Sequence, residues 1–311
     1  MSEELKAGSR LEKILKSGQF AVTGECGPPR SADGNVIIEK TKLLKDKADA
    51  FNITDNQTSV VRMSSIAAAT IMLQQGLEPT MQMVCRDRNR IAIQSDILGA
   101  AALGLKNMLC LSGDHQKFGD HPQSKNVFDI DSIQLIQTVR MMRDEGKLLG
   151  GEEMAVPPRM FIGAAANPFA DPFHIRVPRL AKKVKAGVEF IQTQCIFNMN
   201  KFGEWMKGVV DRGLHEKVFI LGGVTPFKSF GMAKYMAKFV PGMDVPDDLL
   251  QRMKDTPKEN QADEGIKIAV ETIQQLREME GISGVHIMAI EWEEKVGEIA
   301  EKAGLLPRPE V

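Results

Sequence analysis

Short apolar runs alternate with longer amphipathic segments along most of the 311-residue chain. The apolar runs have the length of strands that are buried on both faces of a sheet. They lie at 20–24, 50–54, 80–84, 107–111, 160–165, 190–193, 218–221 and 284–290. Between and after them, patterns typical of helices cover 34–48, 64–75, 94–104, 129–147, 174–186, 200–213, 227–239, 259–280 and 292–304. Glycine often follows these segments, as expected at helix C-termini, and a further helix is expected at about 5–17.

Eight strands that alternate with helices predict a parallel sheet, and eight is the number that closes a (β/α)8 TIM barrel. We interpret residues 1–311 as one such barrel domain, with insertions after strands 4 and 7, where the spacing between strands is longest. The rival architecture is an open doubly wound sheet. It would normally carry a glycine-rich turn after the first strand, where this chain has Pro28 and Pro29.

Composition narrows the class of protein. The formal net charge is −1 and aromatic residues make up 5% of the chain, which disfavours a nucleic-acid binder. No apolar run is long enough to span a membrane, and the charged N-terminus lacks the apolar core of a secretory signal. The four cysteines do not suggest a disulfide framework. We therefore expect a cytoplasmic protein that acts on a small molecule.

Polar residues recur just past the apolar runs, where the active sites of barrels lie. Such residues either simply leave a strand for solvent or form a site. Glu25 favours the second interpretation, because it lies between an apolar strand and the stiff Pro28–Pro29 pair. Apolar surroundings raise the pKa of a carboxyl group, which suits a general acid near neutral pH.

Three other strand ends carry candidate binding groups. Asp114, after Ser112 and Gly113, is able to accept hydrogen bonds from a heterocycle or to form an Asx turn. Gln194 has an amide that both donates and accepts, and it fits either a ligand or the core. Gly223 could lie beside a phosphate. Cys26, Cys85 and Cys195 also follow strands, where small buried side chains are the more common explanation than zinc, and no metal is predicted.

Taken together, the motifs at the strand ends resemble the methylenetetrahydrofolate reductase family of flavin-dependent barrels, over roughly residues 18–305. The matching pieces are ECGPPR at 25–30, Thr54, LSGD at 111–114, Asn167-Pro168 with Asp171-Pro172, KVKAG at 183–187, Thr193-Gln194 and GVTP at 223–226. The resemblance implies reduction of 5,10-methylenetetrahydrofolate to 5-methyltetrahydrofolate, with NAD(P)H or another electron donor. It also implies an oligomeric protein of one-carbon metabolism and methionine biosynthesis.

The resemblance assigns roles residue by residue. Glu25 would be the general acid that protonates N10 of the folate, and Asp114 would bind the pterin and tune the flavin. Gln194 and Thr225 would contact the substrate. The flavin, expected to be FAD, would be held by the remaining matched positions and their neighbours: Thr54, Gln82, Ser112, Gly113, Asp114, Asn167, Asp171, Arg176, Arg179 and Lys183.

The chain also departs from the family pattern. Ser112 stands where the family has Arg, Gln82 where it has His, and Asn167 where it has Tyr. Arg176 and Arg179 replace Asp and Asn, and two arginines there could neutralise a terminal phosphate, so FMN is the alternative to FAD. Such departures resemble family members from acetate-forming anaerobes, in which a second protein subunit accompanies the reductase.

Two further functions stay open on the sequence. One is a flavin-free, pterin-binding barrel that passes a methyl group to a corrinoid or a thiol. The other is a reductase subunit that depends on a partner, suggested by the substituted family residues. Retention of Glu25, Asp114 and Gln194 together argues against an inactive scaffold.

Overall fold

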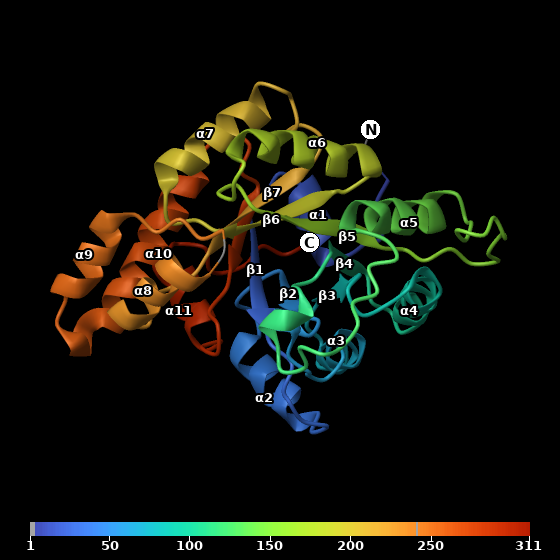
Figure 1. Ribbon diagram of the computed structural model, residues 1–311, viewed down its shortest axis with the longest axis horizontal. Helices are drawn as coiled ribbons and strands as arrows, with labels where there is room; N and C mark the ends of the chain where they lie inside the picture. Colours follow the sequence, from blue (N-terminus) through green and yellow to red (C-terminus); the bar gives the residue numbers. More distant parts are fainter. Residues whose placement is uncertain (1–3, 241) are drawn as a thin grey trace.

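The computed structural model describes residues 4–240 and 242–311, and its centre is a closed barrel of parallel strands (Figure 1). Neighbouring strands in the chain are neighbours in the barrel, and the last strand pairs with the first. The strands are β1 (Ala21–Cys26), β2 (Ala50–Ile53), β3 (Pro79–Val84), β4 (Asn107–Leu111), β5 (Phe161–Ala166), β6 (Phe190–Cys195), β7 (Phe219–Val224) and β8 (Gly284–Ile287). The predicted (β/α)8 barrel is confirmed.

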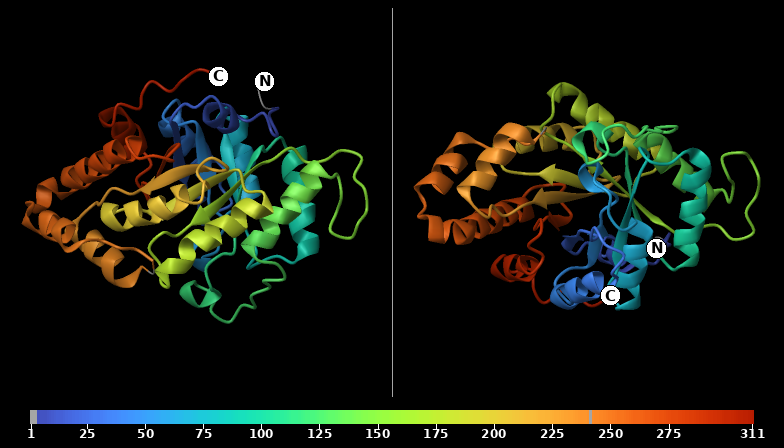
Figure 2. Two further views of the ribbon diagram at one scale, coloured as in Figure 1. Left: turned by 90° about the horizontal axis from the view of Figure 1, so that it is seen from above. Right: turned by 60° about the horizontal axis from the view of Figure 1, so that its bottom comes forward.

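Helices surround the barrel and cover the outward-facing apolar side chains of the strands (Figures 1 and 2). They are α1 (Arg10–Lys16), α2 (Asn35–Leu44), α3 (Ser65–Gln74), α4 (Arg90–Ala102), α5 (Ser132–Asp144), α6 (Arg176–Ala186), α7 (Met199–Val210), α8 (Phe230–Phe239), α9 (Asp247–Asp255), α10 (Gln261–Arg277) and α11 (Lys295–Lys302). The connection from β7 to β8 holds three of them, α8, α9 and α10, which gather on one side of the molecule in Figure 1.

The first helix closes the amino end of the barrel. Leu11, Ile14 and Leu15 are buried against the first residues of several strands, among them Phe161 and Phe190. The helix begins at Arg10, later than the predicted start near residue 5, because Ser9 caps it through the backbone N–H of Glu12. The carboxylate of Glu12 accepts hydrogen bonds from the N–H groups of residues 6–8, which therefore form a loop.

Above this apolar layer the barrel interior is polar. The amides of Asn52 and Gln192 bond to each other across the barrel at 2.5 Å and 3.1 Å. Gln192 also donates to the hydroxyl of Thr23 at 3.1 Å, and that hydroxyl lies 3.0 Å from Nδ1 of His286. Burial lowers the pKa of His286 to about 3, so its imidazole is neutral. These four residues form a satisfied floor beneath the carboxyl ends of the strands.

A register shift between β6 and β7 shapes the carboxyl end of the barrel. Gln192 pairs with Leu221, whereas Cys195 pairs with Gly223, so β6 carries an extra residue. The absence of a side chain at Gly223 permits this approach, because a Cβ atom there would lie 2.4 Å from the carbonyl oxygen of Thr193. Bulges of this kind redirect side chains, and here Gln192, Thr193 and Gln194 all border the same cavity.

The two ends of the described chain lie on the same side of the molecule (Figure 2). Arg308, near the C-terminus, forms an ion pair of 2.6 Å with Asp49, and Arg10 of α1 reaches the same carboxylate at 3.3 Å. Both contacts lie at the amino end of the barrel, beside the start of β2. In the described part of the chain, no helix is long and apolar enough to cross a membrane.

We expect Gly163→Ala to destabilise the barrel by about 1–3 kcal/mol, because overpacking forces side chains out of their favoured rotamers. A Cβ atom at residue 163 would lie 2.2 Å from the ring of Phe190, which stacks on Phe161 with centroids 5.0 Å apart. Urea unfolding measures the loss. Gly203→Ala on α7 is the control, since nothing lies within 4 Å there and alanine favours helix by about 0.5–1 kcal/mol. An equal effect of the two substitutions would contradict the packing described.

Candidate functional site

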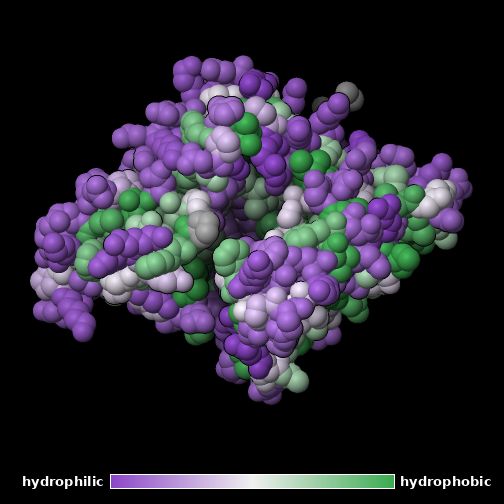
Figure 3. Space-filling model, viewed as in Figure 1, coloured by the Kyte–Doolittle hydropathy of each residue, from purple (hydrophilic) through white to green (hydrophobic). Residues whose placement is uncertain are grey.

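A cavity of about 380 Å³ opens at the carboxyl end of the barrel, where the space-filling view is hollowed near its centre (Figure 3). Its size is that of an ordinary small-molecule site. Eight of the residues predicted for a site border it, and they come from several elements. These are Glu25, Gln82, Ser112, Asn167, Arg176, Arg179, Lys183 and Gln194.

Glu25 lies near the end of β1, in register with Asn52 of β2, and its side chain is partly buried. The pKa of its carboxyl group rises from 4.5 to about 7, chiefly because burial disfavours the charged form. The carboxylate of Glu293 adds to this rise, and Lys40 and Arg62 oppose it. A carboxyl group with such a pKa is able to donate a proton near neutral pH.

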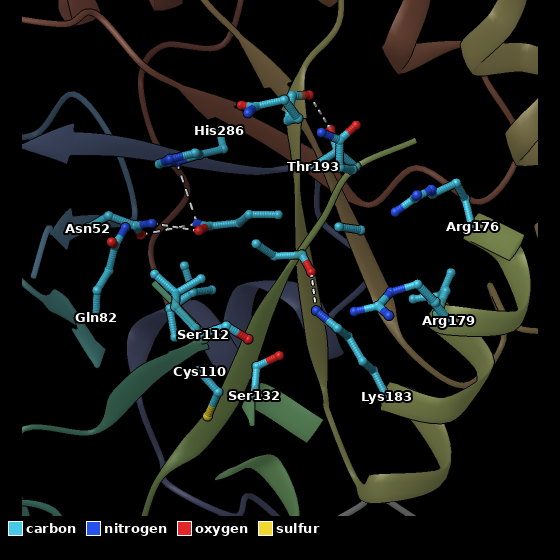
Figure 4. Close-up of a pocket in the computed structure, with 18 of the residues that line it drawn as sticks. Asn52, Gln82, Cys110, Ser112, Ser132, Arg176, Arg179, Lys183, Thr193 and His286 are labelled. Carbon is cyan, nitrogen blue, oxygen red and sulfur yellow. Dashed lines mark hydrogen bonds between the residues drawn. The ribbon is translucent and has the colours of Figure 1, made fainter. Parts of the chain in front are cut away.

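Amides dominate the part of the cavity nearest the barrel axis. Gln194 lines the cavity together with Asn52 and Gln192, and its Oε1 accepts a hydrogen bond from the N–H of Cys195 at 3.2 Å. Gln82 of β3 lies beside Asn52 of the neighbouring strand β2 and adds a further amide (Figure 4). Amides both donate and accept, so this wall suits a flat heterocycle with alternating donors and acceptors.

Positive charge gathers on one wall of the cavity, where α6 presents Arg176, Arg179 and Lys183 (Figure 4). Arg176 donates to the carbonyl oxygens of Ala170 at 2.7 Å and Asp171 at 2.5 Å, and Lys183 donates to that of Ala165 at 2.5 Å. Burial and the neighbouring Arg179 lower the pKa of Lys183 to about 8. No ion pair with a carboxylate involves these three within residues 4–240 and 242–311, so the wall favours an anionic group.

Five predicted residues lie near the rim but do not line the cavity: Thr54, Gly113, Asp114, Asp171 and Thr225. The carboxylate of Asp114 accepts a hydrogen bond from the N–H of Thr58 at 3.0 Å. The hydroxyl of Thr225 lies 2.9 Å from Sγ of Cys195, Asp171 is exposed, and Thr54 is buried. The structure therefore brings Glu25 and Gln194 to one cavity and places Asp114 in a loop beside it.

The loop that Asp114 holds has unusual backbone geometry. Asn56, Thr58 and Ser59 all have positive φ, at 45°, 55° and 60°. Ser59 donates its hydroxyl proton to the carbonyl of Asp114 at 2.9 Å, and Arg86 donates to the same carbonyl at 3.0 Å. Left-handed backbone at such residues costs free energy and persists only where the surroundings hold it, and these hydrogen bonds do so here.

Several lining residues were missed by sequence reasoning, namely Asn52, Gln192, Ser132, Trp205 and His286. Asn52 and Gln192 each lie two residues before a predicted site residue, which is the spacing that puts both on one face of a strand. This two-residue alternation along a strand was the sequence signal from which Asn52 and Gln192 could have been predicted as site residues. Trp205 and Ser132 lie on the helices α7 and α5, and nothing in their local sequence marks them.

The cysteines show no sign of metal binding in the part of the chain that the structure describes. All four are buried and free, and burial raises the pKa of the thiols of Cys26, Cys85 and Cys195 to about 12. No group of three or more His, Cys, Asp or Glu residues gathers there at distances suited to a metal ion.

Fold and site together define a barrel protein with a carboxylic acid, several amides and a cationic wall around one cavity at the carboxyl ends of its strands. Comparison with known sequences narrows this class. The sequence model described as "Methylenetetrahydrofolate reductase" matches residues 10–304, and the chain belongs to that family. The resemblance found in the motifs is thereby confirmed.

Curated relatives agree with the family assignment. "Methylenetetrahydrofolate reductase 2" of Schizosaccharomyces pombe is 23% identical over 98% of this chain and 48% of its own length. "Probable methylenetetrahydrofolate reductase (NADPH)" of Caenorhabditis elegans is 22% identical over 95% of this chain and 44% of its own length. The chain thus spans about half the length of these relatives.

Among solved structures, an uncharacterized protein from Clostridium thermocellum has the same fold, with a TM-score of 0.63 and 12% identity. The alignment covers 95% of this chain and 98% of that one. Its structure is described as binding two copies of 5-methyl-5,6,7,8-tetrahydrofolic acid.

The raised pKa of Glu25 predicts a pH-dependent effect on stability. Below pH 4.5 the carboxyl group is protonated in both folded and unfolded chains, so it contributes no difference. As the pH rises from 4.5 to about 7, the unfolded chain ionises first and folding loses stability. At about 1.4 kcal/mol per pKa unit, and with a discount for solvent in the open cavity, the loss is on the order of 2 kcal/mol.

We therefore expect Glu25→Gln to be more stable than the native chain above about pH 7, and this gain to vanish below pH 4.5. Urea midpoints measured at several pH values check it. Glu204→Gln, which changes an exposed carboxylate on α7, is the control. If the stability gained by Glu25→Gln does not depend on pH, the pKa of the Glu25 carboxyl group is not raised.

Proposed function

We propose that this chain is a flavin-dependent reductase of 5,10-methylenetetrahydrofolate, with Glu25 as its general acid. The observation that carries the proposal is that Glu25, Gln194 and the cationic wall of α6 border a single cavity at the carboxyl end of the barrel. Family membership and the folate-binding neighbour of the same fold support it. One substrate and one flavin would share the cavity.

The cavity fits a flavin on three observations. Its amide wall suits a flat heterocycle, and the cations of α6 suit a phosphate. The third is Trp205, a lining residue whose indole N–H is buried and has no partner among the described residues, so a bound acceptor would satisfy it. Gln82, Ser112 and Asn167 border the cavity as well. Hydride transfer is the chemistry that a reduced flavin supplies when bound.

Glu25 would perform the proton transfer. The methylene carbon of the substrate bridges N5 and N10, and the bond from this carbon to N10 must break. Donation of the Glu25 proton to N10 lets that nitrogen leave as a neutral amine, and the carbon becomes an iminium on N5 that accepts hydride. Gln194 would hold the pterin amide groups in place. Cys195 links it to Thr225, because the N–H of Cys195 donates to Gln194 and its Sγ lies 2.9 Å from the hydroxyl of Thr225.

Asp114 would bind the pterin from its position in a loop at the edge of the cavity. To bind the pterin, its carboxylate would exchange the N–H of Thr58 for a donor of the ligand. The other rim residues, Thr54, Gly113 and Asp171, would help to hold the flavin through the loops in which they lie.

FAD is the expected flavin, and FMN, whose phosphate ends the molecule, suits a wall of three cations equally well. The electron donor would be NAD(P)H or another reductant, and a second subunit and an oligomer remain part of the proposal.

The flavin-free alternative, transfer of a methyl group, is favoured only by the 5-methyl ligand of the structural neighbour. Cofactor release separates the two functions. A yellow protein whose supernatant after heating contains FAD or FMN supports the reductase. A colourless protein that is fully active in methyl transfer would refute it.

Glu25→Gln should leave reduction of the flavin nearly intact and slow reduction of methylenetetrahydrofolate by about 10²–10⁴-fold, the usual contribution of a general acid. Stopped-flow absorbance follows each half-reaction separately, through bleaching and recolouring of the flavin. Glu39→Gln, an exposed carboxylate on α2, is the control. Equal losses in both half-reactions would contradict the role given to Glu25.

Arg179→Met should weaken binding of FMN or FAD by about tenfold and leave riboflavin binding unchanged, because only the phosphorylated flavins meet the cationic wall. Quenching of flavin fluorescence during titration of the apoprotein measures all three. Lys185→Met, on the same helix but outside the cavity, is the matched control. The assignment fails if riboflavin binding falls in parallel.

A further inference from the structure

Glu25 borders two cavities, not one. Besides the large cavity, it lines a smaller one of about 80 Å³. The small cavity lies between the loop after β1, α2, the loop after β2 and the segment after β8. Its charged and polar lining residues are Glu25, Lys40, Gln57, Arg62, Glu291 and Glu293.

The small cavity has the polar lining and the size that suit ordered water. Oε1 of Gln57 and Nε of Arg62 are both buried and have no hydrogen-bond partner among residues 4–240 and 242–311. Such groups are normally satisfied by ordered water. One water needs about 10–15 Å³ of such a cavity, so the volume of about 80 Å³ accommodates several.

An ion pair borders the same space. Nζ of Lys40 bonds to Oε1 of Glu293 and also to the carbonyl oxygen of Gly27 at 3.1 Å. Glu293 is only 8% exposed, so its charge is compensated by Lys40 and not by bulk solvent. The pair therefore fixes a negative and a positive group beside the carboxyl group of Glu25.

The inference rests on the proposed function, in which each turnover removes one proton from Glu25. N10 of the folate gains that proton, the carbon–N10 bond breaks, and the carbon gains hydride. Glu25 is left as a carboxylate and must recover a proton from solvent before the next turnover. A flavin and a pterin in the large cavity would block water on that side.

We propose that the small cavity is the proton port of Glu25, through which water returns a proton to the carboxylate while ligands fill the large cavity. Lys40 and Glu293 are positioning residues of the port. They orient its water and set the balance of charge around Glu25.

The groups that face Glu25 act in opposite directions. Burial and Glu293 raise the pKa of Glu25, and Lys40 and Arg62 lower it. The nearby thiols of Cys26 and Cys195, with pKa values raised to about 12, stay protonated and do not compete for the proton. Glu291 lies at the exposed end of the cavity and His286, with a lowered pKa, lies on the side of the barrel interior.

Filling the port tests the proposal. Gly27 lines the cavity, and a Cβ atom there would meet only Oε1 of Gln57, at 4.0 Å, so Gly27→Leu would place its side chain into the water space. The flavin is first reduced, and methylenetetrahydrofolate is then mixed with it at a pH below 7, where Glu25 already carries its proton. Stopped-flow absorbance records the first turnover, and the steady-state rate with excess donor records the later ones.

We expect the first turnover of Gly27→Leu to stay within about twofold of the native rate and the later ones to slow about tenfold or more. In Gly27→Leu the solvent deuterium isotope effect should be larger in the later turnovers than in the first, in which the exchanged Glu25 carboxyl group already transfers a deuteron. Gly203→Leu on α7 is the control. Equal rates in all turnovers, or an equal loss in both phases, would overturn the port. If no first turnover occurs in the native chain, the proposed function itself fails, so the two failures are distinguishable.

A measurement independent of turnover uses the infrared band of the protonated Glu25 carboxyl group, identified by its loss in Glu25→Gln. Glu293→Gln should lower the pKa read from this band and Lys40→Met should raise it, because each removes one charge beside Glu25. Glu294→Gln and Lys42→Met, exposed neighbours in the chain, are the matched controls. Absence of a shift in both port variants would overturn the roles given to Lys40 and Glu293.

Discussion

The chemistry proposed for this barrel depends on burying one carboxyl group at the end of the first strand. Burial alone makes the charged form of Glu25 costly, and Glu293 increases that cost, so the group holds its proton up to about pH 7. The rest of the barrel supplies the stability that offsets the free-energy cost of burying such a group. A closed barrel with a satisfied polar floor of Asn52, Gln192 and His286 gives the site a rigid base.

The cavity separates its charges in space. The acid lies on β1, while Arg176, Arg179 and Lys183 lie on α6, which follows β5 on the other side of the closed barrel; Figure 4 shows the three cations together on one wall. A ligand with a neutral ring system and an anionic tail would be oriented by this arrangement alone. Specificity for the ring would come from the amides, and affinity would come largely from the cations. Of the residues replaced in this chain, Arg176 and Arg179 belong to the cationic wall and Gln82 belongs to the amide wall.

Much of the fold follows from local pattern, and less of the site does. The eight strands and the helices between them were predictable because buried strands and amphipathic helices have different periods. Helix ends were predicted less well where a side chain replaces helical hydrogen bonds, as Glu12 does before α1. Glu25, Gln194 and the cations of α6 were predictable from motifs that end strands or begin helices. The placement of Asp114 in a loop contact with Thr58, and the entry of Trp205 into the cavity, depend on tertiary packing that no local signal contains.

The closure of the amino end by α1 has a consequence for how the molecule can be joined to others. Arg10 and Arg308 meet on the carboxylate of Asp49, so the described chain enters and leaves at the amino end of the barrel, opposite the mouth of the cavity. An affinity tag, a surface tether or a fused protein attached at either end of the described chain, at residue 4 or residue 311, would start on the side away from the cavity mouth. Ligand access would stay clear, which makes either end a suitable point for immobilising the protein in binding measurements.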